Sequence, residues 1–120
     1  MTRQVFAHDA VVAMDEQSDR RAPGGAITLA LCGDWDHEPP CPMAPHHTAA
    51  ERDGGVVRLR VLFAADPNDE GEVRRRIEEA LATAGVTTPN GTAIQWGLLS
   101  SGPSAVRADE GEHGRRLATQ

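Results

Sequence analysis

The chain has 120 residues, enough for one small domain with a single core, and a formal net charge of −6. All of its 12 basic residues are arginines, because the sequence contains no lysine. The absence of lysine excludes Schiff-base chemistry and the phosphate-binding loops that need a lysine. The acidic balance argues against a protein that binds duplex nucleic acid, since phosphate neutralisation needs a clustered positive face.

Two features bear on the compartment. No apolar run approaches the ~20 residues of a membrane span, and the N-terminus lacks the basic and apolar regions of a signal peptide. We therefore expect a soluble cytoplasmic protein that does not bind membranes. In that reducing compartment a disulfide between Cys32 and Cys41 is an alternative, but two thiols that share a segment with histidines favour metal binding.

The first predicted element is a strand over residues 4–14, because apolar residues alternate with others there. His8 belongs to the more apolar face of this strand, together with Phe6 and Val12. A histidine in that position is usually a core residue with satisfied ring nitrogens, and the alternative is a metal ligand. The segment 22–25, Ala-Pro-Gly-Gly, then predicts a turn.

Two further strands and a helix follow. Residues 26–31 form the most apolar run and predict a central strand that ends at Cys32. The alternation over residues 56–63 predicts another strand, with its arginines directed outward. Asp66 and Pro67 predict the start of a helix that ends at Gly85. Its three consecutive arginines have acidic neighbours at helical spacing, which predicts a solvated face with ion pairs.

The remaining sequence predicts one more strand, over residues 93–99. Residues 104–120 are charged and poor in large apolar groups, so we expect a weak strand and a frayed end there. The chain is thus expected to form one domain over 1–103, followed by a weakly ordered tail over 104–120. The element order predicts an α+β fold, in which a mostly antiparallel sheet of four to five strands has one main helix packed on one face. The first two strands should pair through the turn at 22–25.

The densest cluster of metal-binding residue types lies over residues 32–47, as a long loop between the predicted second and third strands. This segment, CGDWDHEPPCPMAPHH, holds both cysteines and three of the five histidines in the spacing C-x4-H-x3-C-x4-H-H. Its prolines exclude regular helix and ladder pairing over most of its length. Thiolate and imidazole are preferred zinc ligands. The sequence therefore predicts a metal site, with the candidate ligands Cys32, His37, Cys41, His46 and His47.

The spacing allows a closed Cys2His2 shell. Cys32, His37, Cys41 and one of the two adjacent histidines would surround one ion, and zinc in a structural role is the main expectation. Met43 makes copper(I) the runner-up, since thioether and thiolate sulfur are both soft ligands. The spacing lacks the close cysteine pair of zinc fingers, so a plain surface loop and a disulfide-closed loop remain alternatives.

A zinc enzyme is a second hypothesis. His8, His46 and His47 would form an open three-histidine site, with Cys32 or Cys41 as a nucleophile. This arrangement resembles the 6-pyruvoyl-tetrahydropterin synthase family, in which an early strand histidine and a later His-x-His bind zinc near a reactive cysteine. The present chain departs from that pattern, because its later histidines are adjacent and no substrate-anchoring glutamate stands out. The sequence therefore does not assign the chain to that family.

A third hypothesis is a non-enzymatic interaction domain without metal. Trp35 and the proline-rich segment around it would then form an exposed anchor for a partner protein or a second copy of the chain. Trp35 could equally fold inward over the metal or the end of the sheet.

Overall fold

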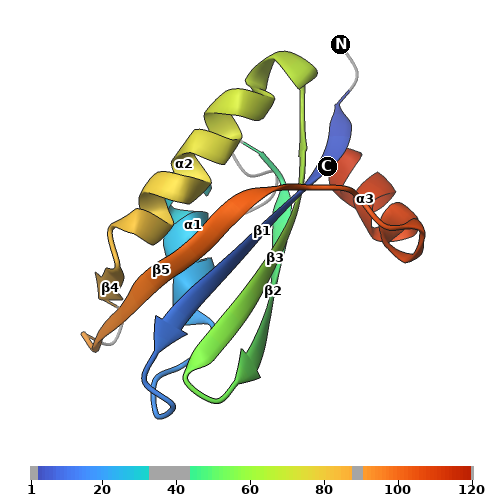
Figure 1. Cartoon of the computed structure of the whole chain (residues 1–120). Coiled ribbons are helices and arrows are strands. Elements are labelled where there is room, and N and C mark those ends of the chain that lie inside the picture. Colours follow the sequence, from blue (N-terminus) through green and yellow to red (C-terminus); the bar gives the residue numbers. More distant parts are fainter. Residues whose placement is uncertain (1–2, 33–43, 88–90, 120) are drawn as a thin grey trace.

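A computed structural model describes residues 3–32, 44–87 and 91–119. Within these residues, five strands form an antiparallel sheet in the order β2-β3-β1-β5-β4 (Figure 1). The strands are β1 (Gln4–Met14), β2 (His46–Asp53), β3 (Val56–Ala65), β4 (Gly85–Thr87) and β5 (Ala93–Ser104). The helices are α1 (Ala22–Cys32), α2 (Glu70–Ala82) and α3 (Gly111–Ala118), with short 3-10 helices at Pro67–Asp69 and Ala108–Glu110. The predicted α+β class is confirmed.

The connections form two interleaved βαβ units. In β1-α1-β2 the strand β3 lies between the two strands of the unit, and in β3-α2-β5 the strand β1 does so. This is the split βαβ topology of ferredoxin-like folds, with β4 added at the edge beside β5. The same topology carries many unrelated activities, so it does not assign a function.

The helix α1 replaces a predicted strand. Residues 22–32 are helical, so the predictions of a turn at 22–25 and of a central strand at 26–31 are wrong. Pro23 lies in the first turn of α1, where a missing N–H leaves no helical hydrogen bond unmade. Full burial recurs every four residues, at Pro23, Ile27 and Leu31, which is a helical period. A short, continuously apolar run does not distinguish a buried helix from a buried strand.

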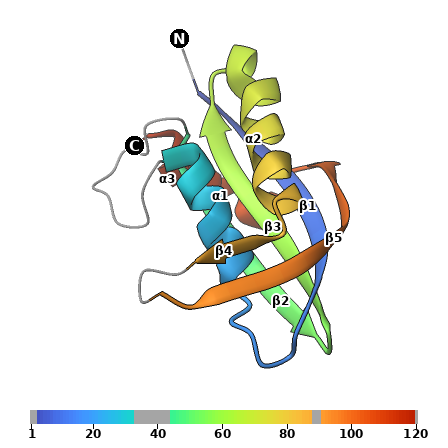
Figure 2. The ribbon, with the colours of Figure 1, turned by 90° about the vertical axis from the view of Figure 1, so that its left-hand side faces the viewer.

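The observed strand pairing differs from the predicted pairing, because a helix stands where the second strand was expected. The first strand does not pair with the next element through the 22–25 turn, because its sheet neighbours are β3 and β5. One face of the sheet is covered by two helices, α1 and α2, rather than by one (Figure 2). The segment 33–43, predicted as an irregular loop, lies outside the described residues, and His46 and His47 begin β2 instead of ending that loop.

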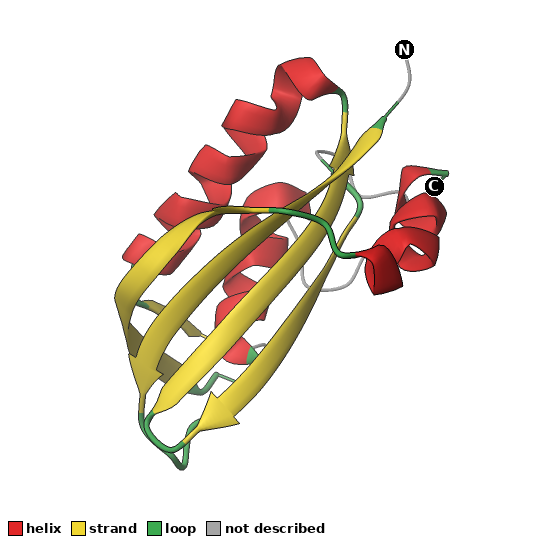
Figure 3. Cartoon of the chain, turned by 45° about the vertical axis from the view of Figure 1, so that its right-hand side comes forward, coloured by secondary structure: helices red, strands yellow, loops and turns green. Residues whose placement is uncertain are grey.

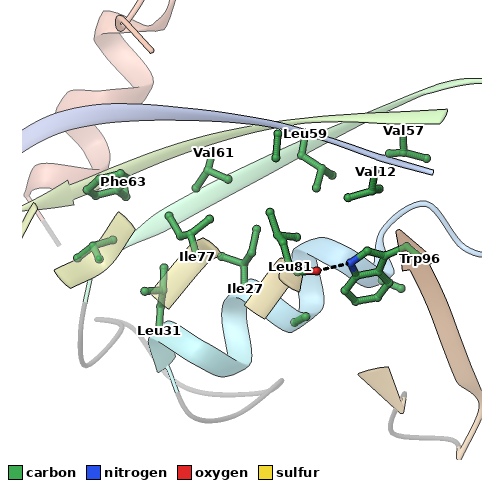
Figure 4. Close-up of a cluster of buried hydrophobic side chains, with 14 of the residues drawn as sticks. Val12, Ile27, Leu31, Val57, Leu59, Val61, Phe63, Ile77, Leu81 and Trp96 are labelled. Carbon is green, nitrogen blue, oxygen red and sulfur yellow. Dashed lines mark hydrogen bonds between the residues drawn. The ribbon is translucent and has the colours of Figure 1, made fainter. Parts of the chain in front are cut away.

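The main core fills the space between this helix pair and the sheet (Figure 4). The indole Nε1–H of Trp96 donates a hydrogen bond to the carbonyl of Leu81 at 3.0 Å, so the indole joins the end of α2 to β5. The inward faces predicted for residues 4–14 and 56–63 are confirmed. The large core side chains are Val12, Ile27, Leu31, Val57, Leu59, Val61, Phe63, Val73, Ile77, Leu81 and Trp96.

The predicted helix start at Asp66 and Pro67 is the start of a 3-10 turn over Pro67–Asp69, which leads into α2 at Glu70, and α2 ends at Ala82. The carboxylate of Asp66 accepts a hydrogen bond from the backbone N–H of Asn68 at 2.9 Å, and Pro67 occupies the first position. At the other end Ala84, not Gly85, takes the left-handed backbone conformation, with φ of 64°. Gly85 instead opens β4.

The opposite face of the sheet carries α3 at one end (Figure 3). Leu117 packs there against Ala7, Leu62 and Ala64. The expectation of a weak strand and a frayed end over 104–120 differs from this arrangement, because residues 111–118 are helical. None of the helices in the described ranges is long and apolar enough to cross a membrane.

Candidate functional site

The predicted metal ligands fall into two groups. Cys32 is the last residue of α1, and His46 and His47 are the first two residues of β2. His37 and Cys41 lie outside the described residues. Among the residues that are described, no three His, Cys, Asp or Glu side chains are grouped so as to hold a metal ion.

The two adjacent histidines lie on opposite faces of the sheet. His46 pairs with Phe63, which belongs to the main core under α1 and α2, whereas His47 pairs with Leu62, which packs under α3. Successive residues of a strand alternate between faces, so this separation follows from β2 being a strand. One ion therefore receives at most one of these two imidazoles without distortion of β2.

The hydrogen bonds of His46 fix its tautomer. Its Nδ1 lies 3.1 Å from the carbonyl oxygen of Ala44, and a carbonyl only accepts, so Nδ1 carries a proton. Its Nε2 lies 3.0 Å from the hydroxyl of Thr28 in α1. In the neutral ring, Nε2 thus presents a lone pair toward α1. Such a carbonyl contact on the other ring nitrogen is the usual orienting contact of a metal-bound histidine.

The Thr28 hydroxyl has a second acceptor. It also lies 3.2 Å from the carbonyl of Gly24, one helical turn earlier. The single hydroxyl proton is directed to only one of these acceptors at a time. Thr28 can therefore turn its proton to Gly24 and release the lone pair of His46 without leaving the hydroxyl unbonded.

A pocket of about 420 Å³ lies between α1 and the start of β2, beside His46. Thr28, His46 and Thr48 are among the residues that line it. Gly24 allows the close approach of the two elements, since a Cβ there would lie 3.3 Å from Cγ2 of Thr48. A small ion in solvent therefore reaches the side of His46.

On the other face, His47 contacts His113 of α3. The centroids of the two imidazole rings are 4.7 Å apart, and the ring planes are tilted by 55°. Partial desolvation, and to a lesser extent the neighbouring His113, lowers the pKa of His47. Sequence reasoning missed His113, because it lies in the segment that was expected to fray.

His8 is a fully buried core residue, as its face of the strand predicted. The guanidinium of Arg74 donates to its Nδ1 at 3.1 Å, so the proton is on Nε2, which donates to the hydroxyl of Ser101 at 2.8 Å. Burial, followed by the charge of Arg74, lowers the pKa of His8. Both ring nitrogens are thus occupied. His8 neither has a lone pair for a metal nor accepts the proton of Ser101 as a base.

The hypothetical three-histidine site is therefore not assembled. His8 contacts α2 and β5, whereas His46 contacts α1 and His47 contacts α3. No group of metal-binding side chains within the described ranges includes all three.

Arg60 is an unexpected centre of polar contacts. Its guanidinium forms two hydrogen bonds with the carboxylate of Glu110, at 2.6 and 3.0 Å, and one each with Asp9 and Ser104. Its side chain is 14% exposed, whereas that of Arg58 is 61% exposed. Both arginines are thus directed away from the main core, as predicted. Arg60 is nevertheless largely buried, because the segment that leads into α3 covers it.

Comparison with known proteins does not assign a family. No protein-family model, no curated protein and no solved structure matches the chain.

Proposed function

We propose that this chain binds one zinc ion in a structural Cys2His2 site formed by Cys32, His37, Cys41 and His46. His37 and Cys41 enter this proposal through their sequence spacing alone. Two thiolates balance the charge of a divalent cation, and four protein ligands leave no open position for a substrate. The thiolates require a reducing compartment, so the proposal includes a cytoplasmic location.

The tautomer of His46 is the observation that carries the proposal. The Ala44 carbonyl fixes the proton on Nδ1, and Nε2 is directed toward α1. A metal ion binds the unprotonated nitrogen of a neutral imidazole, so this ring has the orientation that a zinc ligand needs. His47 is the weaker candidate for this shell because it belongs to the other face of β2.

The place of Cys32 in the chain also supports the proposal, because Cys32 belongs to the helix that contacts His46. Cys32 is the last residue of α1, four positions and about one helical turn after Thr28. Thr28 already contacts Nε2 of His46.

The proposed ion would have a structural role. It would join the end of α1 to the start of β2 and hold the intervening segment, which is rich in proline and poor in apolar residues. A chain with few unfolded conformers loses less entropy when an ion fixes it. Copper(I) is the runner-up, with Met43 as a soft ligand.

The test is the zinc content of untagged protein after gel filtration, measured by elemental analysis. We expect about one equivalent per chain, and loss of this tightly bound zinc in the double variant Cys32→Ser/Cys41→Ser. Retention of the zinc in that variant would refute the thiolate site. Absence of metal together with two freely titrating thiols would favour an interaction domain without metal.

A further inference from the structure

The contact between His47 and His113 joins two elements that are far apart in sequence. His47 lies on β2 and His113 on α3, and their rings meet on the sheet face opposite His46. Across the described ranges, neither ring forms a hydrogen bond, so their nitrogens have no protein partner there beyond the ring contact itself. The fold thus brings into contact two imidazoles that are 66 positions apart in the sequence and form no hydrogen bond with the described part of the chain.

We propose that His47 and His113 form a second metal site, which binds a late divalent transition-metal ion such as Zn²⁺ or Cu²⁺ and fastens α3 to β2. Imidazole is a strong ligand for these ions, whereas Mg²⁺ and Ca²⁺ prefer oxygen. The site is independent of the proposed Cys2His2 shell, because that shell uses His46 on the other face of β2.

The ring separation fits an ion between the two side chains. A metal–nitrogen bond of about 2.0–2.1 Å puts the centre of an imidazole ring roughly 3.2 Å from the ion. Two such rings with centroids 4.7 Å apart then subtend an angle of about 95° at the ion. This angle lies between the octahedral and tetrahedral values, so the separation of the two rings is compatible with one shared ion.

The surroundings allow an ion to enter and to complete its shell. His47 is exposed and His113 is partly exposed, so water molecules can fill the remaining coordination positions. The ion needs only two protein ligands, which implies weaker binding than a four-ligand site. We therefore expect this ion to exchange during gel filtration, unlike the zinc of the Cys2His2 shell.

The consequence for the fold is a second attachment point for α3. Glu110 already binds Arg60 at the start of that segment, and Leu117 packs into the apolar cluster between the helix and the sheet. His113 lies between these two residues in sequence. An ion shared with His47 would hold the middle of α3 to β2, and so slow the local opening of the helix.

The experiment uses the full chain in the Cys32→Ser/Cys41→Ser background, which removes the thiolate site. Zn²⁺ alone is titrated into chelator-treated protein, with calorimetry for stoichiometry and NMR for the imidazole resonances. We expect saturable binding of one ion, shifts of the His47 and His113 resonances, and at least tenfold slower amide exchange in α3. His113→Gln, which keeps a side chain of similar size, should weaken binding at least tenfold. Arg116→Gln, at an exposed position of the same helix, serves as the control and should leave the binding unchanged.

The possible results separate the two proposals. Binding that His113→Gln leaves intact, or the absence of any saturable binding in folded protein, overturns the second site. Circular dichroism of each variant establishes that it is folded. If gel-filtered wild-type protein holds no tight zinc but the double variant still binds Zn²⁺ through His113, the Cys2His2 proposal fails and the second site stands.

Discussion

The contact between Arg60 and Glu110 predicts a pH-dependent stability of the attachment of α3. Glu110 accepts two hydrogen bonds from the Arg60 guanidinium and a third from the backbone N–H of Arg107 at 2.8 Å. These contacts, the guanidinium foremost, lower the pKa of Glu110 from 4.5 to about 2. The side chain of Glu110 is 15% exposed, so solvent screens the pair only in part. Glu110→Gln removes the charge and keeps the shape.

The magnitude follows from this pKa change. A carboxyl whose pKa falls from 4.5 to about 2 on folding contributes at most about 3 kcal/mol to the free energy of unfolding. Allowing for solvent screening, we expect Glu110→Gln to lose about 1–2 kcal/mol at neutral pH. Because the native pKa is the lower one, the contribution is complete above about pH 4.5 and falls as the pH approaches 2. More than half of the difference between wild type and variant should be lost by about pH 3.

The assay is urea unfolding at several pH values, followed by circular dichroism, with hydrogen exchange of residues 105–119 as a local measurement. Glu112→Gln is the matched control. The Glu112 side chain is 78% exposed, and its contact with Arg116, at 3.5 Å, is long for an ion pair. That variant should stay within about 0.5 kcal/mol of wild type. Equal effects of the two substitutions at neutral pH, or a Glu110→Gln effect that does not change between neutral pH and pH 3, would refute the reasoning.

Three further predictions concern the backbone and the core. Ala84→Gly should raise the free energy of unfolding, measured in thermal or urea unfolding, by about 0.5–1 kcal/mol, because the backbone φ of 64° at this position favours glycine. Ala82→Gly, at a helical position of α2, should lower the free energy of unfolding by a similar amount. Gly114→Ala should destabilise by about 1–3 kcal/mol, since its methyl group would lie 2.8 Å from a β1 side chain, whereas Gly111→Ala, with nothing within 4 Å, should be nearly neutral. In NMR, His8 should be the Nε2–H tautomer with a pKa below 6.5, and a value at or above 6.5 would contradict its burial beside a guanidinium.

The strands and α2 could be predicted because their apolar residues follow a clear period. Large apolar residues recur at most second positions of 4–14 and 56–63, and Asp66 and Pro67 mark a helix start through local chemistry alone. The helix α1 could not be recognised, because it is apolar on nearly every side and is covered by both the sheet and α2. The helix α3 could not be recognised either, because Leu117 is its only large apolar residue.

The candidate site was predictable in residue type but not in geometry. The cluster of cysteines and histidines is visible in the sequence, yet its partition between two sheet faces depends on His46 and His47 belonging to a strand. The roles of Thr28 and His113 depend on α1 and α3, the two helices that the pattern did not reveal. Long-range pairing thus supplied the parts of the site that local sequence could not.

The proposed zinc shell is tested most directly by the absorption spectrum of protein reconstituted with Co²⁺ in place of zinc. Tetrahedral cobalt with thiolate ligands gives intense visible bands and a sulfur-to-metal charge-transfer band. We predict both in wild type and in His47→Ala, and their loss or marked change in His46→Ala, because His46 alone of the two has Nε2 directed toward α1. Absence of these bands in wild type, or their loss in His47→Ala but not in His46→Ala, would contradict the account.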